Sequence, residues 1–370
     1  MNNIKTKEKF KFSITNMTFF TYLKMFIAIL IAFAITFGIL CLISDDPLFA
    51  AKTILFGPLQ KPRYIGEVIE SFIPYAFAGL CCCFLFSAGF FNLGTEGIYI
   101  MSGLAMTFVA IAPINIIIVH PILCFVVAMV VGGLLMLIPA YLKAKFGASE
   151  MVLSLMLNSI YLALAYFVVR KTCASPTSSS VVSADFAKTA KIGYIISKYH
   201  ISICLFVLIA VTIISYLVLY KTRLGYQIRL SGTNPKFADY SGINAFKLSM
   251  ITNFIAGSIA GLGSACYLLT QFSYFAWTST SPGVGFSGSL LAMLGTNNPI
   301  GTVVASFLIK YLEEGSKVLY YIDSTIPSEI IAIVEGIVIL FVSSQNFLVG
   351  FREKKLLKEG LVGKAERRDR

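Results

Sequence analysis

Residues Phe72 to Phe91 read FIPYAFAGLCCCFLFSAGFF, a run without a charged side chain. A helix of about 20 apolar residues is long enough to cross the hydrocarbon core of a bilayer. Similar apolar runs occur on both sides of it, and 57% of the 370 residues are hydrophobic while only 13% are charged. A soluble domain is about half apolar and a quarter charged. The sequence therefore predicts an all-α protein, a bundle of transmembrane helices.

The apolar runs predict about ten membrane spans, some of them discontinuous. The expected spans are residues 25–43, 72–91, 98–114, 121–142, 151–169, 200–220, 248–269, 286–294, 301–321 and 327–343. The segment 286–294 is too short for an ordinary span, and 301–321 carries Glu313 and Glu314. A transmembrane barrel would need alternating polar and apolar residues, whereas these runs are apolar on every face.

An even number of crossings places both termini on one side of the membrane. The lysine-rich start and the basic tail make that side the cytoplasm, because short cytoplasmic segments are enriched in Lys and Arg. In a multi-pass protein of the cell (cytoplasmic or inner) membrane, we expect a basic N-terminus, a transmembrane domain and a basic tail at 1–24, 25–344 and 345–370. Residues 221–247 form a cytoplasmic loop and 170–199 an external one, although the external loop holds more basic residues than this rule favours.

The net charge of +12 could also indicate nucleic acid binding. That class of protein carries a basic stripe with stacking aromatic residues on a soluble fold, and this sequence has no such pattern. Most of the Lys and Arg residues fall on the expected cytoplasmic side. The basic charge is therefore interpreted as a signal for membrane orientation, and no nucleic acid partner is expected.

The residues that commonly hold metals or carry out catalysis are scattered. Most of the eight cysteines lie in apolar segments, there is no pair of CxxC motifs, and His120 and His200 stand alone. We therefore expect no metal site, no cofactor and no disulfide framework, and the chain is not expected to be an enzyme. It also lacks the G-x-x-x-x-G-K-[ST] loop that cradles nucleotide phosphates. If transport uses ATP, another subunit must bind it.

Residues 91–97, FNLGTEG, interrupt the apolar pattern between the second and third spans. Asn92, Gly94 and Gly97 break a helix, and Glu96 places an ionisable group at the edge of the apolar region. Such a break at membrane depth packs inside protein or lines a watery cavity, and its carboxylate is a candidate functional group. Alternatively, the segment is a tight turn in which Glu96 complements the dipole of the following helix.

A second interruption flanks the short apolar segment 286–294. Breakers lie on both sides of it, which is typical of the discontinuous or re-entrant helices of transporters; the residues singled out are Gly285, Phe286, Gly288, Gly295, Asn297, Asn298 and Pro299. Close helix packing through small residues is the alternative. We favour the discontinuous helix.

The loop 221–247 contains GTNPKFADYSGI at residues 232–243. The pair Asn234 and Pro235 can start a short helix, on which Phe237, Tyr240 and Ser241 share one face. An amphipathic helix of this kind is suited to a groove on a partner protein. The residues expected to make this docking element are Gly232, Asn234, Pro235, Phe237, Ala238, Tyr240 and Gly242.

These segments resemble the permease subunits of bacterial ABC importers for nucleosides and simple sugars. FNLGTEG is similar to the family's F-N-[IVL]-G-x-E-G, and GASEMVLSLMLN at 147–158, with Glu150 and Asn158, to its N-E-[VI]-[IL]-x-x-[LI]-M-L-N. The segment 232–243 resembles G-x-N-P-x-A-A-x-Y-x-G-I, and GVGFSGSLLAMLGTNNPIG at 283–301 resembles G-x-G-F-x-G-I-A-V-A-L-L-G-x-N-x-P-x-G. The group belongs with the branched-chain amino acid and ribose permeases and is paired with lipoprotein receptors of the basic-membrane-protein type.

The resemblance implies a type II importer permease and a set of partners. These are the lipid bilayer, a second permease, cytoplasmic ATP-binding subunits and an extracytoplasmic substrate-binding lipoprotein. The resemblance also implies that 221–247 touches the ATPase, and the helix breaks are expected to line the translocation pathway because of their polar residues at membrane depth. Two transport alternatives stay open: a permease for riboflavin or branched-chain amino acids on the same scaffold, and an ion-coupled transporter using Glu96, Glu313, Glu314 and Glu335.

Overall fold

The computed structural model describes residues 37–38, 41, 46–176, 181–196, 199, 201–277, 281–322 and 336. The expected terminal segments 1–24 and 345–370, almost all of the first and last expected spans, and Glu335 lie outside these residues. The chain divides into two compact units, one formed by residues 57–314 and the other by 1–56 together with 315–370. The residues singled out in the two helix breaks and in the segment 221–247 all belong to the unit 57–314.

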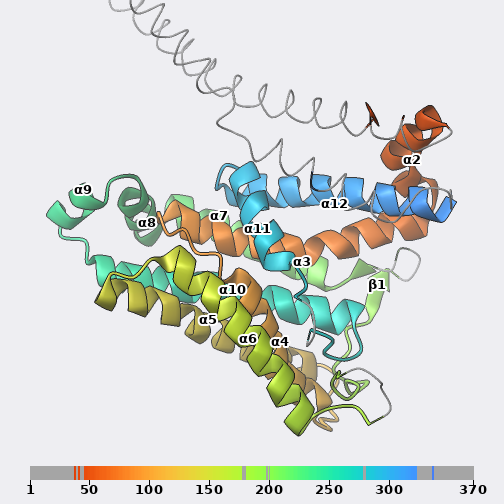
Figure 1. Ribbon diagram of the computed structural model, residues 1–370, viewed down its shortest axis with the longest axis horizontal. Helices are drawn as coiled ribbons and strands as arrows, with labels where there is room; N and C mark the ends of the chain where they lie inside the picture. Colours follow the sequence, from red (N-terminus) through yellow and green to blue (C-terminus); the bar gives the residue numbers. More distant parts are fainter. Residues whose placement is uncertain are drawn as a thin grey trace, which may run out of the picture. The chain divides into compact units, whose positions relative to one another are not determined.

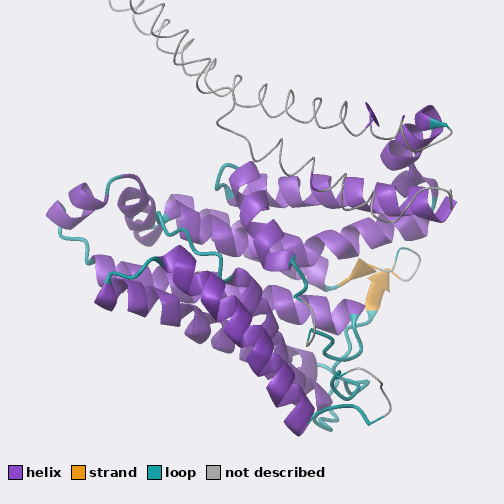
Figure 2. Cartoon of the chain, in the orientation of Figure 1, coloured by secondary structure: helices purple, strands orange, loops and turns teal. Residues whose placement is uncertain are grey.

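The described part is mostly helical (Figures 1 and 2). Its longer helices are α2 (Pro47–Gln60), α3 (Pro62–Ser87), α4 (Thr95–Ile111), α5 (Val119–Phe146), α6 (Glu150–Thr172), α7 (Cys204–Lys221), α10 (Ala245–Gln271) and α12 (Pro299–Ile322). Three shorter helices are α8 (Arg223–Thr233), α9 (Pro235–Tyr240) and α11 (Val284–Leu294). A small antiparallel sheet pairs β1 (Tyr194–Ile196) with β2 (Ile201–Ser202).

Five described helices, α3, α5, α6, α7 and α10, are long and apolar enough to cross a membrane. They confirm the predicted spans 72–91, 121–142, 151–169, 200–220 and 248–269, with different ends. The pair α11 and α12, bent by 120° at its break, adds a sixth if it is counted as one span, and α4 is a shorter apolar helix of 17 residues. A multi-pass helical membrane protein follows from these lengths and compositions.

The ends of α3 show why apolar runs misplace helix boundaries. The helix begins at Pro62, because proline fits the first helical turn, where its missing N–H is not needed. It therefore includes the charged residues Arg63 and Glu67, which the hydropathy pattern excludes. It ends at Ser87 rather than Phe91, since Gly89 adopts a left-handed backbone with φ of 76°.

The helix α10 lies in the core and packs against α5, α3 and α4. Glycines allow its backbone to touch α5: a Cβ added to Gly257 would lie 2.3 Å from the carbonyl oxygen of Gly132, and one added to Gly261 would lie 2.0 Å from that of Ala128. Small residues permit such close approach between helices that pack in a membrane. The polar break at 91–97, described below, lies next to this closely packed pair of helices.

Two connecting segments hold regular structure that the apolar pattern did not predict. The segment 170–199, expected to be an external loop, contains β1, so the expectation of a purely helical chain is corrected. Because β2 takes up residues 201–202, α7 begins at Cys204 rather than at His200. The segment 221–247 is more ordered than a loop with one short helix, since it also contains α8, whose first turn is capped by the Thr222 hydroxyl accepting from the Gly225 amide at 3.1 Å.

Candidate functional site: two helix breaks and a docking helix

Glu96 joins the starts of two helices. Glu96 lies in the first turn of α4, the position expected if residues 91–97 form a tight turn before that helix. It is only 7% exposed. Its carboxylate accepts hydrogen bonds from the amides of Gly283 at 2.7 Å and Gly285 at 2.6 Å, and from the Ser281 hydroxyl. Gly283 and Gly285 open α11, whose first amides have no partner within the helix. The carboxylate therefore caps α11 from a neighbouring helix.

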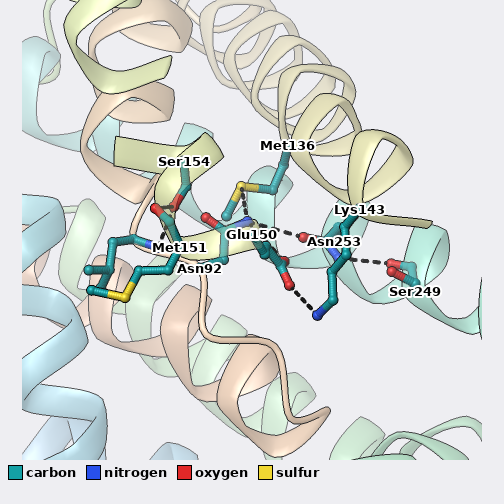
Figure 3. A network of polar contacts seen from close by, with 9 residues as sticks. Asn92, Met136, Lys143, Glu150, Met151, Ser154, Ser249 and Asn253 are labelled. Atoms are coloured by element: carbon teal, nitrogen blue, oxygen red, sulfur yellow. Dashed lines mark hydrogen bonds and ion pairs between the residues drawn. The ribbon is translucent and has the colours of Figure 1, made fainter. Parts of the chain in front are cut away.

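Asn92 is fully buried in the turn before α4. Its Oδ1 accepts from the amide of Gly94 at 2.7 Å, which fixes the turn. Its Nδ2 donates to Glu150 Oε1 at 3.3 Å and lies 3.5 Å from Asn253 Oδ1. Figure 3 shows these side chains converging from the turn, from the first residue of α6 and from α10.

Side chains of α6 form hydrogen bonds with backbone groups of the 91–97 turn that have no partner within the turn. Ser154 Oγ accepts from the amide of Leu93 at 3.1 Å. Asn158 accepts from the amide of Gly97 at 2.9 Å through Oδ1 and donates to the carbonyl of Leu93 at 2.9 Å through Nδ2. Buried backbone groups outside helices need such partners. The turn and the start of α6 therefore form one structural unit.

Glu150 is held by a lysine that the sequence pattern did not single out. Lys143 Nζ lies 2.7 Å from Glu150 Oε2; the Glu150 side chain is 3% exposed and that of Lys143 is 37% exposed. The same ammonium lies 4.6 Å from the centre of the Phe90 ring. Figure 3 shows Lys143 at the end of α5 reaching Glu150. The ion pair balances a carboxylate that would otherwise be costly to bury.

The helices α11 and α12 are separated by a break, at the position where a discontinuous or re-entrant helix was predicted. Thr296 and Asn297 both adopt left-handed backbones, with φ of 56° and 55°. The Asn297 carbonyl accepts from Cys83 Sγ at 2.9 Å, which ties the break to α3. Asn298 Oδ1 then accepts from the Ile300 amide at 3.0 Å and caps α12, which starts at Pro299.

The flanks of α11 also show the close packing that we considered as the alternative. A Cβ on Gly285 would lie 2.2 Å from the Glu96 amide nitrogen, and one on Gly288 would lie 2.5 Å from the Ala78 side chain. On Gly295 it would lie 2.3 Å from the Thr302 nitrogen. Phe286 is 57% exposed and is not drawn into this cluster.

The predicted amphipathic helix forms as α9. Asn234 Oδ1 accepts from the Phe237 amide at 3.1 Å, Pro235 occupies the first turn, and Gly242 ends the helix with φ of 78°. Ala238 is buried, whereas Phe237 and Tyr240 are 53% and 91% exposed. The helix thus presents two aromatic side chains outward. Beside it, a cavity of about 620 Å³ is lined by Lys221, Thr222, Arg223, Tyr226, Gln227, Leu230, Phe237, Ser241 and Ile243.

Among the described residues, no group of three or more His, Cys, Asp or Glu side chains could hold a metal ion. Glu313, a candidate ion site from the sequence, forms an ion pair with Lys310 on the same helix. The Lys310 ammonium also lies 3.3 Å from the centre of the Tyr75 ring. The positive charge reduces the ability of Glu313 to act as a cation site on its own.

Sequence reasoning missed Lys143, Ser154 and Asn253. Polar residues inside apolar helices are a usable signal, since such residues in membrane helices face the interior and pair with one another. Asn253 carries that signal: it is fully buried in α10 and its Nδ2 donates to the Ser249 carbonyl at 3.0 Å. Lys143 gives a weaker one, because basic residues are also common at helix ends.

Apolar helices of spanning length, with polar breaks whose backbone is hydrogen-bonded to neighbouring helices, are typical of a multi-pass membrane protein. Residues 64–343 match the family described as branched-chain amino acid transport system / permease component. The chain belongs to this family, as the resemblance of its motifs predicted. Members of the family are membrane components of transporters rather than enzymes, and this chain is a permease subunit of that kind.

Curated relatives align over most of their length. The chain is 32% identical to the guanosine ABC transporter permease protein NupP of Bacillus subtilis, over 83% of this chain and 87% of that protein. It is 27% identical to the nucleoside ABC transporter permease protein NupB of Lactococcus lactis, over 86% and 89%. It is 26% identical to the glucose ABC transporter permease protein TsgB13 of Haloferax volcanii, over 88% of each. No solved structure matches the chain significantly.

Proposed function

We propose that this chain is the permease of an ATP-binding cassette importer that moves a nucleoside, or a related sugar-containing solute, into the cell. The observation that carries the substrate class is the similarity to a guanosine permease over most of both chains. ATP binding and hydrolysis are assigned to a separate cytoplasmic subunit. A second permease, identical or related, and a lipoprotein receptor complete the proposed complex.

The proposed topology has about ten spans, including the expected first and last ones. Both termini lie in the cytoplasm, with the basic segments 1–24 and 345–370 flanking the transmembrane domain 25–344. Residues 221–247 are then cytoplasmic and 170–199 external. The excess of Lys and Arg on one side supports this orientation.

The two helix breaks are proposed to border the translocation pathway. The residues assigned to them are Asn92, Gly94, Glu96, Gly97, Glu150, Asn158, Gly285, Phe286, Gly288, Gly295, Asn297, Asn298 and Pro299. Because Asn92, Glu96 and Glu150 are buried and hydrogen-bonded to other residues of the breaks, the proposed role of this set is to hold the interrupted helices in place. Irregular backbone at membrane depth is tolerated only where it packs in protein or lines a cavity.

The segment 221–247 is proposed to receive the force of ATP hydrolysis. The residues assigned to this coupling are Gly232, Asn234, Pro235, Phe237, Ala238, Tyr240 and Gly242. The exposed aromatic side chains of α9 support docking, since aromatic residues dominate many protein interfaces. In the proposed cycle, closure of the ATPase pulls on this segment, and the permeases then alternate the side to which the pathway opens.

The test is uptake by liposomes that contain the complete complex with its receptor. We expect guanosine to enter only when ATP is supplied on the ATPase side, and an excess of unlabelled nucleoside to compete. Competition by glucose, riboflavin or leucine instead would reassign the solute. Uptake without ATP that collapses when a proton or sodium gradient is abolished would establish the ion-coupled alternative and overturn the proposal.

A further inference from the structure

Arg229, in the middle of α8, has a buried hydrogen-bond donor without an acceptor. Its guanidinium carbon lies 4.8 Å from the centre of the Tyr220 ring on α7, so the charge is placed over an aromatic face. Its Nε atom is buried and has no hydrogen-bond partner among the described residues. An unsatisfied buried donor costs free energy. Its Nε–H is therefore a buried donor that an acceptor from another element could satisfy.

Asn297, in the break between α11 and α12, has a buried hydrogen-bond acceptor without a donor. Its Oδ1 atom is buried and has no hydrogen-bond partner within the described part. Its backbone is left-handed, and so is that of Thr296 before it. Non-glycine residues in this region are uncommon and mark strain or function. The break thus combines an unusual backbone with an unused acceptor.

Tyr220 lies between Arg229 and Asn298, the residue that follows Asn297. The Tyr220 ring carries Arg229 on its face, and its hydroxyl lies 3.5 Å from Asn298 Nδ2, the residue next to Asn297. The donor belongs to the segment that we propose couples to the ATPase, whereas the acceptor belongs to the discontinuous helix. Figure 1 shows α8 beside the end of α7, and the two helices are in contact.

A second route links the same two elements through α3. A Cβ added to Gly232 in α8 would lie 2.3 Å from the Ser87 carbonyl oxygen, so the two backbones touch. The Ser87 hydroxyl in turn lies 3.5 Å from the Asn297 carbonyl oxygen, which Cys83 also contacts. Contacts therefore connect α8 with the break by two routes, one through Tyr220 and one through the end of α3.

From these contacts we infer that Arg229 Nε–H and Asn297 Oδ1 form a hydrogen bond in a second state of the transport cycle, after α8 has moved. The bond satisfies both unpaired atoms at once, and charge-assisted hydrogen bonds are stronger than neutral ones. It makes Arg229 and Asn297 positioning residues that transmit the movement of α8 to the break between α11 and α12. The inference rests on the proposed function, because it requires a partner that moves α8.

The test is a double-mutant cycle in the complete reconstituted complex. Arg229→Met keeps much of the length of the side chain but has no hydrogen-bond donor, and Asn297→Gly allows a left-handed backbone while removing the acceptor. We expect each variant to lower ATP-dependent guanosine uptake by about tenfold. The double variant should be no slower than the slower single variant, because one bond cannot be lost twice.

Two further measurements separate the bond from a purely structural role. Asn297→Asp retains an acceptor oxygen and should restore most of the uptake, and recovery of the ATPase on co-purification should be normal for all variants. The matched control is Arg63→Met on the exposed part of α3, which should transport normally. Single variants with normal uptake, or losses that multiply in the double variant, overturn the inference. Failure of the proposed function would instead show in the wild-type complex, as the absence of ATP-dependent uptake.

Discussion

The backbone of Gly232 lies directly against that of Ser87, since a Cβ added to Gly232 would be 2.3 Å from the Ser87 carbonyl oxygen. This contact joins α8 to the end of α3, a few residues before the buried turn that begins α4. Gly89, with its left-handed backbone, lies on the same contact. The segment 221–247 and the polar break are therefore adjacent parts of one unit.

Gly232→Ala should disturb this contact. The added methyl group meets backbone on the neighbouring helix, which cannot rotate away, so we expect a loss of about 1 to 3 kcal/mol in the free energy of unfolding. The measurement is thermal or denaturant unfolding of the purified permease in detergent. Gly193→Ala is the control, because a Cβ there meets no atom within 4 Å. Equal stability of the two variants would contradict the packing at Gly232.

Glu96→Gln should destabilise the protein. Both carboxylate oxygens accept backbone amides, whereas a glutamine would point its own NH₂ group at one of them. An unpaired donor of this kind costs about 1 to 3 kcal/mol, and Glu96→Leu, which accepts nothing, should cost more. The exposed variant Glu67→Gln should cost less than about 1 kcal/mol. If Glu96→Gln abolished uptake with unchanged stability, the charge itself would be required, in favour of ion coupling.

Lys143→Met should be rescued by a second change at its partner. The single variant leaves the Glu150 carboxylate buried beside Asn92 without its cation, and unpaired buried charges are strongly destabilising. In Lys143→Met with Glu150→Gln, the amide can still pair with Asn92, so the double variant should unfold at a higher temperature than the single one. Equal or lower stability of the double variant would mean that the ion pair contributes little.

The sequence was informative where structure depends on local pattern. Apolar runs located the middle of α3 and α10, and the Asn234 and Pro235 pair located α9, because spans and caps are encoded by neighbouring residues. The partners of the breaks could not be found in this way. Contacts such as Glu96 with Gly285 join residues far apart in the chain, and only tertiary packing brings them together.

The same reasoning explains the elements that were missed. The strand β1 is three residues long, too short for a hydropathy pattern. The helix α8 lies among polar residues, so a search for apolar runs did not find it, although Thr222 at its start is a recognised cap residue. The buried Nε donor of Arg229 has no sequence signature, because its lack of an acceptor depends on which residues the tertiary structure brings near it.

The docking role of α9 is tested by Phe237→Ala combined with Tyr240→Ala. Both side chains are largely exposed, so the double variant should insert into the membrane and unfold at nearly the wild-type temperature. If they anchor the ATPase, truncation should weaken association by at least about 2 kcal/mol, the range found for interface hot spots. Uptake should fall steeply, and the ATPase should be recovered poorly or should hydrolyse ATP without responding to receptor and nucleoside.

The control for this variant is Phe167→Ala. Phe167 is 58% exposed in the last part of α6, outside the segment 221–247, so its truncation removes a similar exposed ring without touching the proposed interface. This variant should keep both uptake and ATPase recovery. If the Phe237 and Tyr240 double variant behaves in the same way as Phe167→Ala, α9 is a simple connection between α8 and α10. The ATPase must then dock elsewhere on the permease.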